Sequence, residues 1–287
     1  MQTKIKSSKS DVESESGLVV ERRFTSAGQD PFESFEWIEI DVQIRNPDGS
    51  MADSLEGVKL PSGFSGVPGT VCAQKYLRKA GVPKYLRTVP EDDVPIWLQR
   101  SEPDHERLQT VDAAERMGGE IDGRQLFRRL AGTWTYWGWK YGYFASEADA
   151  RAYFDEMCYL IASQRSAPNS PQWFNTGLHW AYGIEGPAQG HSYVDPDTGE
   201  LGKSTNAYEH PQPHACFIQS VSDSLVGGTD SIMGLWNREA LLFKYGSGTG
   251  SNFSNIRGKG EPLSGGGTSS GLLSFLKIGD RLSLIHI

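Results

Sequence analysis

One stretch decides the fold: residues 214–254 read HACFIQSVSDSLVGGTDSIMGLWNREALLFKYGSGTGSNFS. Apolar and polar residues alternate over residues 216–221, which predicts a strand. A helix is expected next, because Asp230 or Ser231 can cap it and apolar residues then recur at helical spacing. Gly246 can take the left-handed conformation that ends such a helix, and a second strand is expected after it. The order strand, helix, strand predicts an α/β domain.

Glycines crowd the segment that closes this helix, residues 246–250. A phosphate-binding P-loop is excluded, because no Gly-Lys-Ser/Thr follows. A dinucleotide-binding turn is excluded too, because it follows a strand and opens a helix, whereas this segment closes a helix. Two interpretations stay open: a helix-ending loop with surplus glycine, or a backbone that a ligand can approach closely. A second glycine segment, residues 265–270, precedes a last expected helix that begins near Leu272.

Upstream, the pattern changes several times. Residues 1–17 are polar and predict a disordered tail. Residues 35–42 alternate with period two, and the turn residues 46–49 follow, which predicts a hairpin. A helix is expected over residues 73–80, ended by Gly81-Val82-Pro83, because proline removes a hydrogen-bond donor and restricts the residue before it.

Aromatic residues are concentrated in residues 126–144, and a core layer is favoured there over a base-stacking platform. Ser146 resembles the first residue of a capping box and predicts the start of a helix. Cys158 falls on the apolar stripe of that helix and is expected to be a core residue, as is Cys72. Residues 183–213 are too long for a simple connection.

The composition argues against several classes of protein. The 287-residue chain is 37% hydrophobic with a formal charge of −8, and its dispersed basic residues argue against a nucleic-acid-binding surface. Three cysteines give no disulfide framework, which suits a reducing compartment. No apolar run reaches the ~20 residues of a membrane span. A cytoplasmic enzyme with neither a nucleic-acid nor a membrane partner is expected.

Metal binding is disfavoured. His191, His210, His214 and Cys216 could bind zinc, but their spacing matches no closed zinc site, so no metal ligand is assigned and a zinc module is only a weak alternative. Cys216 by itself is typical of an inert strand cysteine. A reactive thiol needs an accessible position.

Four segments carry a more specific signal: residues 167–177 (APNSPQWFNTG), 214–225, 243–258 and 260–267. They resemble the bacterial adenosylcobalamin-dependent (class II) ribonucleotide reductases. The similarity is strong over residues 165–281 and weaker over residues 20–165. The long loop before the cysteine strand favours class II over the large subunit of the class I reductases.

The resemblance implies an α/β fold, in which a mostly helical N-terminal region precedes the first part of a ten-stranded α/β barrel. The expected organisation is a tail at residues 1–17, an N-terminal region of short strands and helices at 18–165, the start of the barrel at 166–281, and a tail foreign to the family at 282–287. On this interpretation the chain is a truncated fragment that lacks the radical cysteine and is inactive alone.

The resemblance also implies the chemistry and the site. The family reduces ribonucleotides, here expected to be ribonucleoside diphosphates, with adenosylcobalamin as cofactor, a thioredoxin-like or dithiol reductant, a deoxynucleotide effector and a possible homodimer. A class I large subunit or a non-catalytic nucleotide-binding fragment are the alternatives. By position, Cys216 corresponds to the first cysteine of the reducing pair. The other corresponding positions are Ser170, Ala215, Cys216 and Gly248 for the substrate, and Asp223, Lys244 and Arg257 for the effector.

Overall fold

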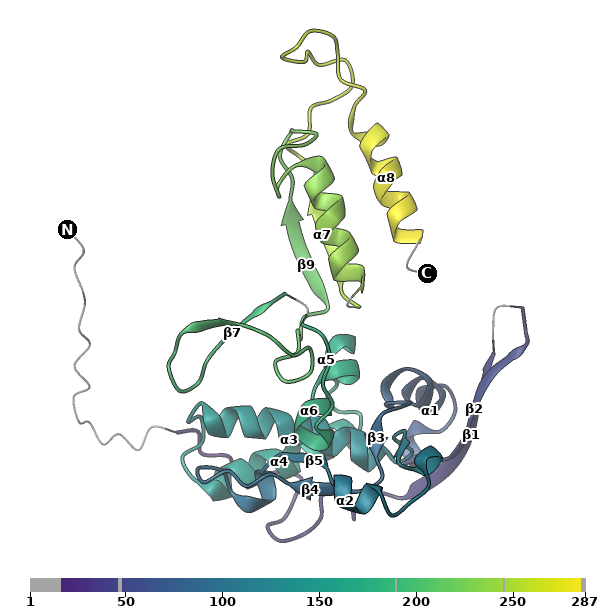
Figure 1. Ribbon diagram of the computed structural model, residues 1–287, viewed down its shortest axis with the longest axis vertical. Helices are drawn as coiled ribbons and strands as arrows, with labels where there is room; N and C mark the ends of the chain where they lie inside the picture. Colours follow the sequence, from purple (N-terminus) through teal and green to yellow (C-terminus); the bar gives the residue numbers. More distant parts are fainter. Residues whose placement is uncertain (1–16, 46–47, 189, 245, 285–287) are drawn as a thin grey trace, which may run out of the picture.

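The computed structural model describes residues 17–45, 48–188, 190–244 and 246–284. Figure 1 shows a lower body that contains α1 to α6 and an upper lobe in which β9 and α7 stand beside α8. The elements are, in chain order, β1 (Trp37–Arg45), β2 (Met51–Pro61), η1 (Ser62–Phe64), α1 (Val67–Val71), η2 (Cys72–Tyr76), β3 (Val82–Pro83), β4 (Leu86–Thr88), η3 (Ile96–Leu98), β5 (Ser101–Pro103), α2 (His105–Leu108), η4 (Ala113–Glu115), β6 (Met117–Gly118), α3 (Gly123–Lys140), α4 (Glu147–Ala162), α5 (Ser170–Asn175), α6 (Leu178–Tyr182), β7 (Ser192–Val194), β8 (Leu201–Lys203), β9 (Cys216–Ser220), α7 (Ile232–Lys244), β10 (Gly248–Asn252) and α8 (Leu272–Leu284).

The predicted hairpin is confirmed. β1 pairs antiparallel with β2, and the partners include Ile38 with Leu60 and Val42 with Leu55. One face of the hairpin covers the core of the lower body, where Val42, Val58 and Leu60 are at most 4% exposed. Residues 46 and 47 of the expected turn, like residues 1–16 of the expected tail, lie outside the described residues.

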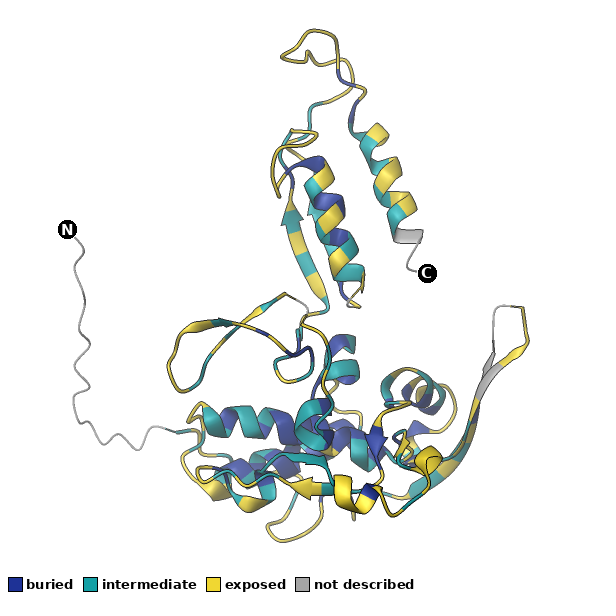
Figure 2. Cartoon of the chain, viewed as in Figure 1, coloured by how far each residue is buried: buried dark blue, intermediate teal, exposed yellow. Residues whose placement is uncertain are grey.

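The main core lies between α3 and α4 in the lower body, where Figure 2 shows most of the buried residues. α4 starts where the sequence predicts, because Ser146 Oγ accepts a hydrogen bond from the Asp149 amide at 3.2 Å. Cys72 and Cys158 are both buried in this core, as expected. Burial raises the pKa of the Cys72 thiol to about 12, which keeps it protonated and unreactive at neutral pH.

The helix expected over residues 73–80 ends early, so that prediction is wrong beyond Tyr76. Leu77 has an extended backbone (ψ 133°). Side chains of two distant residues form hydrogen bonds with the backbone here, in place of helical ones. Arg129 Nη2 donates to the Tyr76 carbonyl at 3.1 Å, and the Arg78 amide donates to Glu120 Oε2 at 2.8 Å. Tertiary hydrogen bonds replace helical ones here, four residues before the expected end of the helix at Ala80.

The aromatic stretch is partly a core layer. Within α3, Leu126, Phe127 and Leu130 are fully buried, which confirms the favoured interpretation for the first half of the helix. Further along, Tyr136 and Trp137 are only half-buried and line a cavity instead.

The upper lobe has the predicted strand–helix–strand order. β9 and β10 are parallel, and Cys216 pairs with Gly248 at the first position of the ladder. Ser231 caps α7, since its Oγ accepts from the Gly234 amide at 3.1 Å. Gly246 has a left-handed φ of 79° directly after the helix. α8 then packs on α7, where Phe275 and Leu276 contact the cluster of Leu235 and Trp236.

Each sheet in the described part of the chain has two strands, and β9–β10 is the parallel pair. A helix with its two parallel strands fits the α/β class. The described residues form no closed barrel, so the ten-stranded barrel stays a prediction. The long loop at residues 183–213 holds the β7–β8 hairpin. No described helix is long and apolar enough to cross a membrane.

Candidate functional site

Cys216 lies at the start of β9 with its side chain exposed. Its strand partner is Gly248, and a Cβ added to Gly248 would meet Cys216 Sγ at 3.7 Å. The Gly248 amide donates to the Ala215 carbonyl at 2.5 Å, which ties the two strands together at this point. The missing Gly248 side chain therefore leaves open backbone directly beside an accessible thiol. Three of the positions assigned to the substrate, Ala215, Cys216 and Gly248, are in contact.

A small polar network fixes this end of the strand pair. Ser247 is buried, and its Oγ donates to the His214 carbonyl at 2.8 Å. Gln212 Nε2 donates to Ser247 Oγ and to the same carbonyl, each at 2.8 Å. These bonds hold the residues before Cys216 and Gly248 in register. Sequence reasoning missed both Ser247 and Gln212, which lie beside the predicted site in the sequence but carry no motif of their own.

Two charged residues of α7 fix the strands from the helix side. Glu239 is buried and accepts from Ser251 Oγ at 2.8 Å. Arg238 donates to Gln219 Oε1 at 2.7 Å and to the Ser220 carbonyl at 3.1 Å. The helix and both strands are thus one hydrogen-bonded unit. A carboxylate within the apolar stripe of α7 was the available signal for Glu239.

Ser170 is the first residue of α5, in the lower body directly below β9 in Figure 1. α5 reaches the glycine segment through Phe174, whose ring would lie 3.9 Å from a Cβ on Gly246. α5 therefore contacts the lobe that carries Cys216 and Gly248. The helix that begins with Ser170 and the glycine segment that contains Gly248 are therefore neighbours.

Arg129 anchors the other end of α5. Its guanidinium, 0% exposed, donates to the Trp173 carbonyl at 3.0 Å and to the Thr176 carbonyl at 2.7 Å. It is also paired with Glu120, Nε to Oε1 at 2.7 Å, and that side chain is fully buried too. Tyr182 donates to the same carboxylate at 2.8 Å. This buried network links the core of the lower body to the helix that begins with Ser170.

Asp223 and Arg257 meet at the other end of the strand pair. Arg257 Nε donates to Asp223 Oδ2, and the Arg257 amide lies 3.3 Å from Oδ1. The Arg257 hydrogen bond holds the pKa of Asp223 below its ordinary value. They meet because both follow the carboxyl ends of neighbouring parallel strands, where ligands commonly bind in α/β folds.

Lys244 lies far from Asp223 and Arg257 of the same chain. It is the last residue of α7, whose 13 residues span roughly 20 Å at ~1.5 Å per residue. Asp223 precedes the start of that helix. The three positions assigned to the effector thus divide into an Asp223–Arg257 pair and a distant lysine.

The side chains considered as zinc ligands, His191, His210, His214 and Cys216, do not form a cluster that could bind a metal. Where the structure describes the chain, no group of three or more His, Cys, Asp or Glu side chains could hold a metal ion. His191 Nε2 is hydrogen-bonded to the His210 carbonyl, and the His210 ring stacks on Tyr193 at 3.6 Å between ring centroids. A cavity of about 1360 Å³ lies among these rings, between α3 and the residues around β9.

Known proteins of one family are similar to this chain. Residues 39–164 match the family model described as class II vitamin B12-dependent ribonucleotide reductase, and residues 214–285 match the ribonucleotide reductase barrel domain. Three similar relatives are each named vitamin B12-dependent ribonucleotide reductase. They come from Agrobacterium fabrum (63% identical over 262 residues, 91% of this chain and 20% of the relative), Bradyrhizobium diazoefficiens (60% over 262 residues, 91% and 21%) and Rhodopirellula baltica (34% over 268 residues, 93% and 22%). The chain therefore spans about a fifth of the length of these relatives.

Proposed function

Because this chain belongs to the class II, vitamin B12-dependent ribonucleotide reductase family, we propose that it forms part of an enzyme that reduces ribonucleotides to 2′-deoxyribonucleotides. The observation that carries the proposal is the exposed Cys216 thiol beside the bare backbone of Gly248. The names of the relatives favour this proposal over a class I large subunit.

Cys216 serves as one of two thiols that supply the electrons. In the overall reaction the 2′-hydroxyl of the ribose leaves as water, a hydrogen takes its place, and two thiols are oxidised to a disulfide. Cys72 and Cys158 are buried in the lower body, so neither is placed to be the partner of Cys216. An external dithiol, thioredoxin-like in the cell, restores the pair by thiol–disulfide exchange. Adenosylcobalamin, when bound, supplies the radical chemistry.

The substrate, a ribonucleoside diphosphate, lies against Gly248 and the Ala215–Cys216 backbone. The open backbone at Gly248 lets the ribose approach the thiol without displacing a side chain. Ser170 contributes a hydroxyl for a phosphate oxygen, and α5 is held in place by Arg129 and by the Phe174 contact with the glycine segment.

The same proposal includes an N-terminal region at residues 18–165, the start of the barrel at residues 166–281, and a cytoplasmic location.

A deoxynucleotide effector binds at the Asp223–Arg257 end, and a homodimer supplies the lysine. Asp223 accepts from a deoxyribose hydroxyl, while Arg257 and Lys244 interact with phosphates. Two copies of α7 packed antiparallel about a two-fold axis would bring Lys244 of one chain to the Asp223 end of the other. Exposed apolar residues on α7 and α8, Met233, Leu241, Leu273 and Ile278, support such a contact.

The test is a chimera in which this chain replaces the aligned segment of the Agrobacterium fabrum relative. We expect deoxynucleotide to form from a ribonucleoside diphosphate with adenosylcobalamin and a dithiol, and without a second protein. Cys216→Ser in the chimera should still bind nucleotide but should not complete multiple turnovers, because no disulfide can form. Cys72→Ala, which removes a buried thiol, is the control and should still turn over. Multiple turnovers at the wild-type rate in Cys216→Ser would refute the assignment.

A further inference from the structure

The thiol of Cys216 lies at the end of the hydrogen bonds that join β9 to β10. Both strands begin at this point, where the Gly248 amide donates to the Ala215 carbonyl at 2.5 Å. One residue earlier the Ser247 amide donates to a carbonyl of α7 at 3.0 Å, and Pro213 has no amide proton to donate. The terminal pair of a strand ladder opens more easily than the pairs inside it, so the position of the thiol depends on what holds this end.

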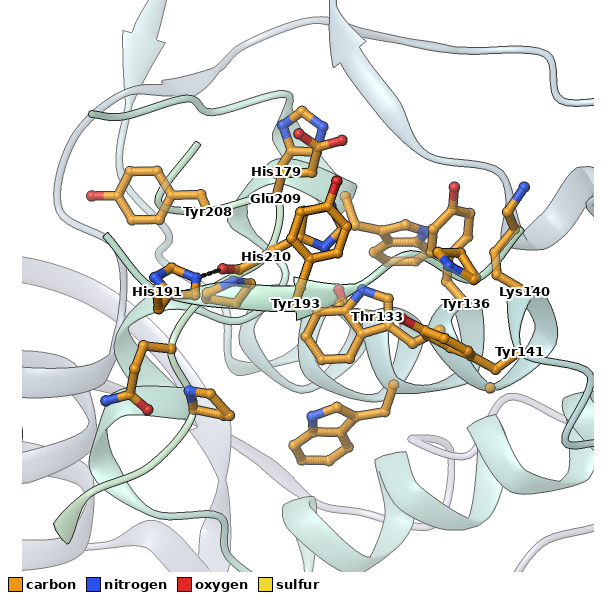
Figure 3. Close-up of a pocket in the computed structure, with 18 of the residues that line it drawn as sticks. Thr133, Tyr136, Lys140, Tyr141, His179, His191, Tyr193, Tyr208, Glu209 and His210 are labelled. Carbon is orange, nitrogen blue, oxygen red and sulfur yellow. Dashed lines mark hydrogen bonds between the residues drawn. The ribbon is translucent and has the colours of Figure 1, made fainter. Parts of the chain in front are cut away.

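The segment that leads into β9 is restricted. The His210 carbonyl accepts a hydrogen bond from His191 Nε2, and the His210 ring stacks on Tyr193 with 3.6 Å between the ring centroids. Figure 3 shows these three side chains together, with the hydrogen bond as a dashed line. A proline stands on each side of Gln212, and a proline ring fixes its own φ. The backbone around Gln212 therefore has little conformational freedom.

The side-chain amide of Gln212 binds both backbone groups of His214. Its Oε1 accepts from the His214 amide, and its Nε2 donates to the His214 carbonyl at 2.8 Å. Nε2 also donates to Ser247 Oγ at 2.8 Å, and Ser247, which is 4% exposed, donates to the same carbonyl at 2.8 Å. Two side chains, called here the strand-start pair, thus supply at His214 the hydrogen bonds that a neighbouring strand supplies inside a ladder.

The strand-start pair acts close to the thiol, whereas the side chains of α7 act farther along the strands. The hydrogen bonds from α7 reach Gln219 and Ser220 of β9 and Ser251 of β10, which lie at least three residues beyond Cys216 and Gly248. The strand-start pair instead holds the residue that precedes Cys216 by two positions. The two sets of contacts therefore fix opposite ends of the strand pair.

We propose that Gln212 and Ser247 are positioning residues, which hold the Cys216 thiol beside Gly248 at the place that reduction of the ribose requires. The inference rests on the proposed function and adds to it two side chains that act through the backbone of His214. Without the strand-start pair the first pair of the ladder opens, and the sulfur moves relative to the backbone on which the ribose lies. A displacement of about 1 Å at a reacting group can cost ~10²-fold in rate. The loss should fall mainly on kcat, because the contacts to the rest of the nucleotide are unchanged.

Two variants remove the strand-start pair in the Agrobacterium chimera, and each has a matched control. Ser247→Ala removes a hydroxyl that is 4% exposed and donates to a carbonyl at 2.8 Å. Ser204→Ala removes a hydroxyl with the same exposure, which donates to the Asn206 carbonyl at 2.8 Å directly after β8. Gln212→Met removes the side-chain amide but keeps the length of the side chain. Gln99→Met does the same for an amide that donates to two carbonyls, at 2.9 and 3.1 Å, in the lower body.

Three quantities are measured for each variant: steady-state reduction of a ribonucleoside diphosphate, the midpoint of thermal unfolding, and amide hydrogen exchange by mass spectrometry. We expect Ser247→Ala and Gln212→Met to lower kcat about tenfold, with a smaller rise in KM. Each control should shift the unfolding midpoint by a similar amount but keep the kcat of the parent chimera. The peptide that covers residues 214–218 should exchange faster in the two strand-start variants and not in the controls.

A double variant tests whether the two side chains act as one unit. Gln212→Met combined with Ser247→Ala should lower kcat no further than the larger of the two single losses, because either change alone opens the same end of the ladder. A loss equal to the product of the single losses would overturn the shared role.

The remaining outcomes separate this inference from the proposed function. If the parent chimera forms deoxynucleotide but the strand-start variants lose no more kcat than their controls, the positioning role is overturned and the proposed function stands. Unchanged exchange of residues 214–218 would also overturn it, because the pair would then not hold the strand. If the parent chimera forms no deoxynucleotide, the proposed function fails, and hydrogen exchange still decides whether Gln212 and Ser247 hold the start of β9.

Discussion

Adjacent arginines on α3 offer a direct measurement of what burial adds to an ion pair. Arg129 lies 2.7 Å from Glu120, with both side chains 0% exposed. Arg128 lies 2.6 Å from Asp30, with the two side chains 48% and 40% exposed. The pairs have almost equal length and come from neighbouring residues of one helix. Any difference between Arg129→Met and Arg128→Met therefore reports on burial and on the additional partners of Arg129.

The structure sets the expected magnitudes. Arg129→Met leaves the Glu120 carboxylate buried without its cation and removes the donor from three backbone carbonyls. Breaking a buried pair in this way costs about 3–5 kcal/mol of unfolding free energy. Arg128→Met breaks a solvated pair, which is worth about 0–1 kcal/mol. Methionine keeps most of the aliphatic stem in both variants, so the lost packing is similar.

Urea unfolding of the 287-residue chain, followed by tryptophan fluorescence, measures both losses. We expect Arg129→Met to lose at least about 2 kcal/mol more than Arg128→Met. Adding Glu120→Gln to Arg129→Met should recover part of the loss, because the amide removes the unpaired charge. Equal losses in the two arginine variants, or no recovery in the double variant, would refute the argument that the buried charge needs its partner. In the chimera, Arg129→Lys should then raise KM for the ribonucleotide more than it lowers kcat, because Arg129 acts through the position of α5.

Three further predictions concern the strand pair and the N-terminal segment. Gly248→Ala should leave the unfolding free energy within about 1 kcal/mol, since its Cβ would make ordinary contacts at 3.5 and 3.7 Å, yet should weaken ribonucleotide binding in the chimera; unchanged binding would count against an approach beside Cys216. Arg257→Ala should weaken effector binding by about 1.5–3 kcal/mol, the range for hydrogen bonds to a charged group, and should change effector-free turnover far less; parallel loss of both would argue against an effector site. Burial alone would raise the pKa of Glu156, but hydrogen bonds from the Thr25 side chain and from the amides of residues 23–25 outweigh it and hold the pKa below its ordinary 4.5. The stability from this carboxylate is therefore complete above about pH 4.5 and is lost as pH falls through the lower, folded pKa, so Glu156→Gln should flatten acid unfolding in that range; an identical pH profile in the variant would contradict this.

Local patterns predicted the parts of the fold that depend on neighbours in sequence. The β9–α7–β10 unit follows from alternation, from the Ser231 cap and from Gly246, all within 40 residues or so of chain. The burial of Cys158 follows from its place on a helical stripe. Each of these features needs only the period of a strand or helix and the chemistry of a cap.

Features set by distant residues could not be predicted in this way. The helix that should reach Ala80 stops at Tyr76 because Arg129, 53 residues away, binds the Tyr76 carbonyl. Nothing in the sequence around Arg129 distinguishes it from Arg128, which lies on the surface. The separation of Lys244 from Asp223 likewise follows from the length of α7, because Asp223 precedes the helix and Lys244 is its last residue. The family resemblance assigns Asp223, Lys244 and Arg257 to one effector, but it does not state whether all three come from the same copy of the chain.

The strand pair places its two proposed sites at opposite ends of a short rigid body. Cys216 begins β9 and Asp223 follows its end, and the five paired residues of the strand, 216–220, span roughly 16 Å at ~3.3 Å per residue. Arg238 and Glu239 bond α7 to both strands, so the strands cannot slide independently of the helix. A displacement that an effector causes at Arg257 would therefore reach the thiol as a shift of the whole unit, without any relay of side chains. The identity of the bound deoxynucleotide would then affect the reaction through the position of β9, which carries Cys216.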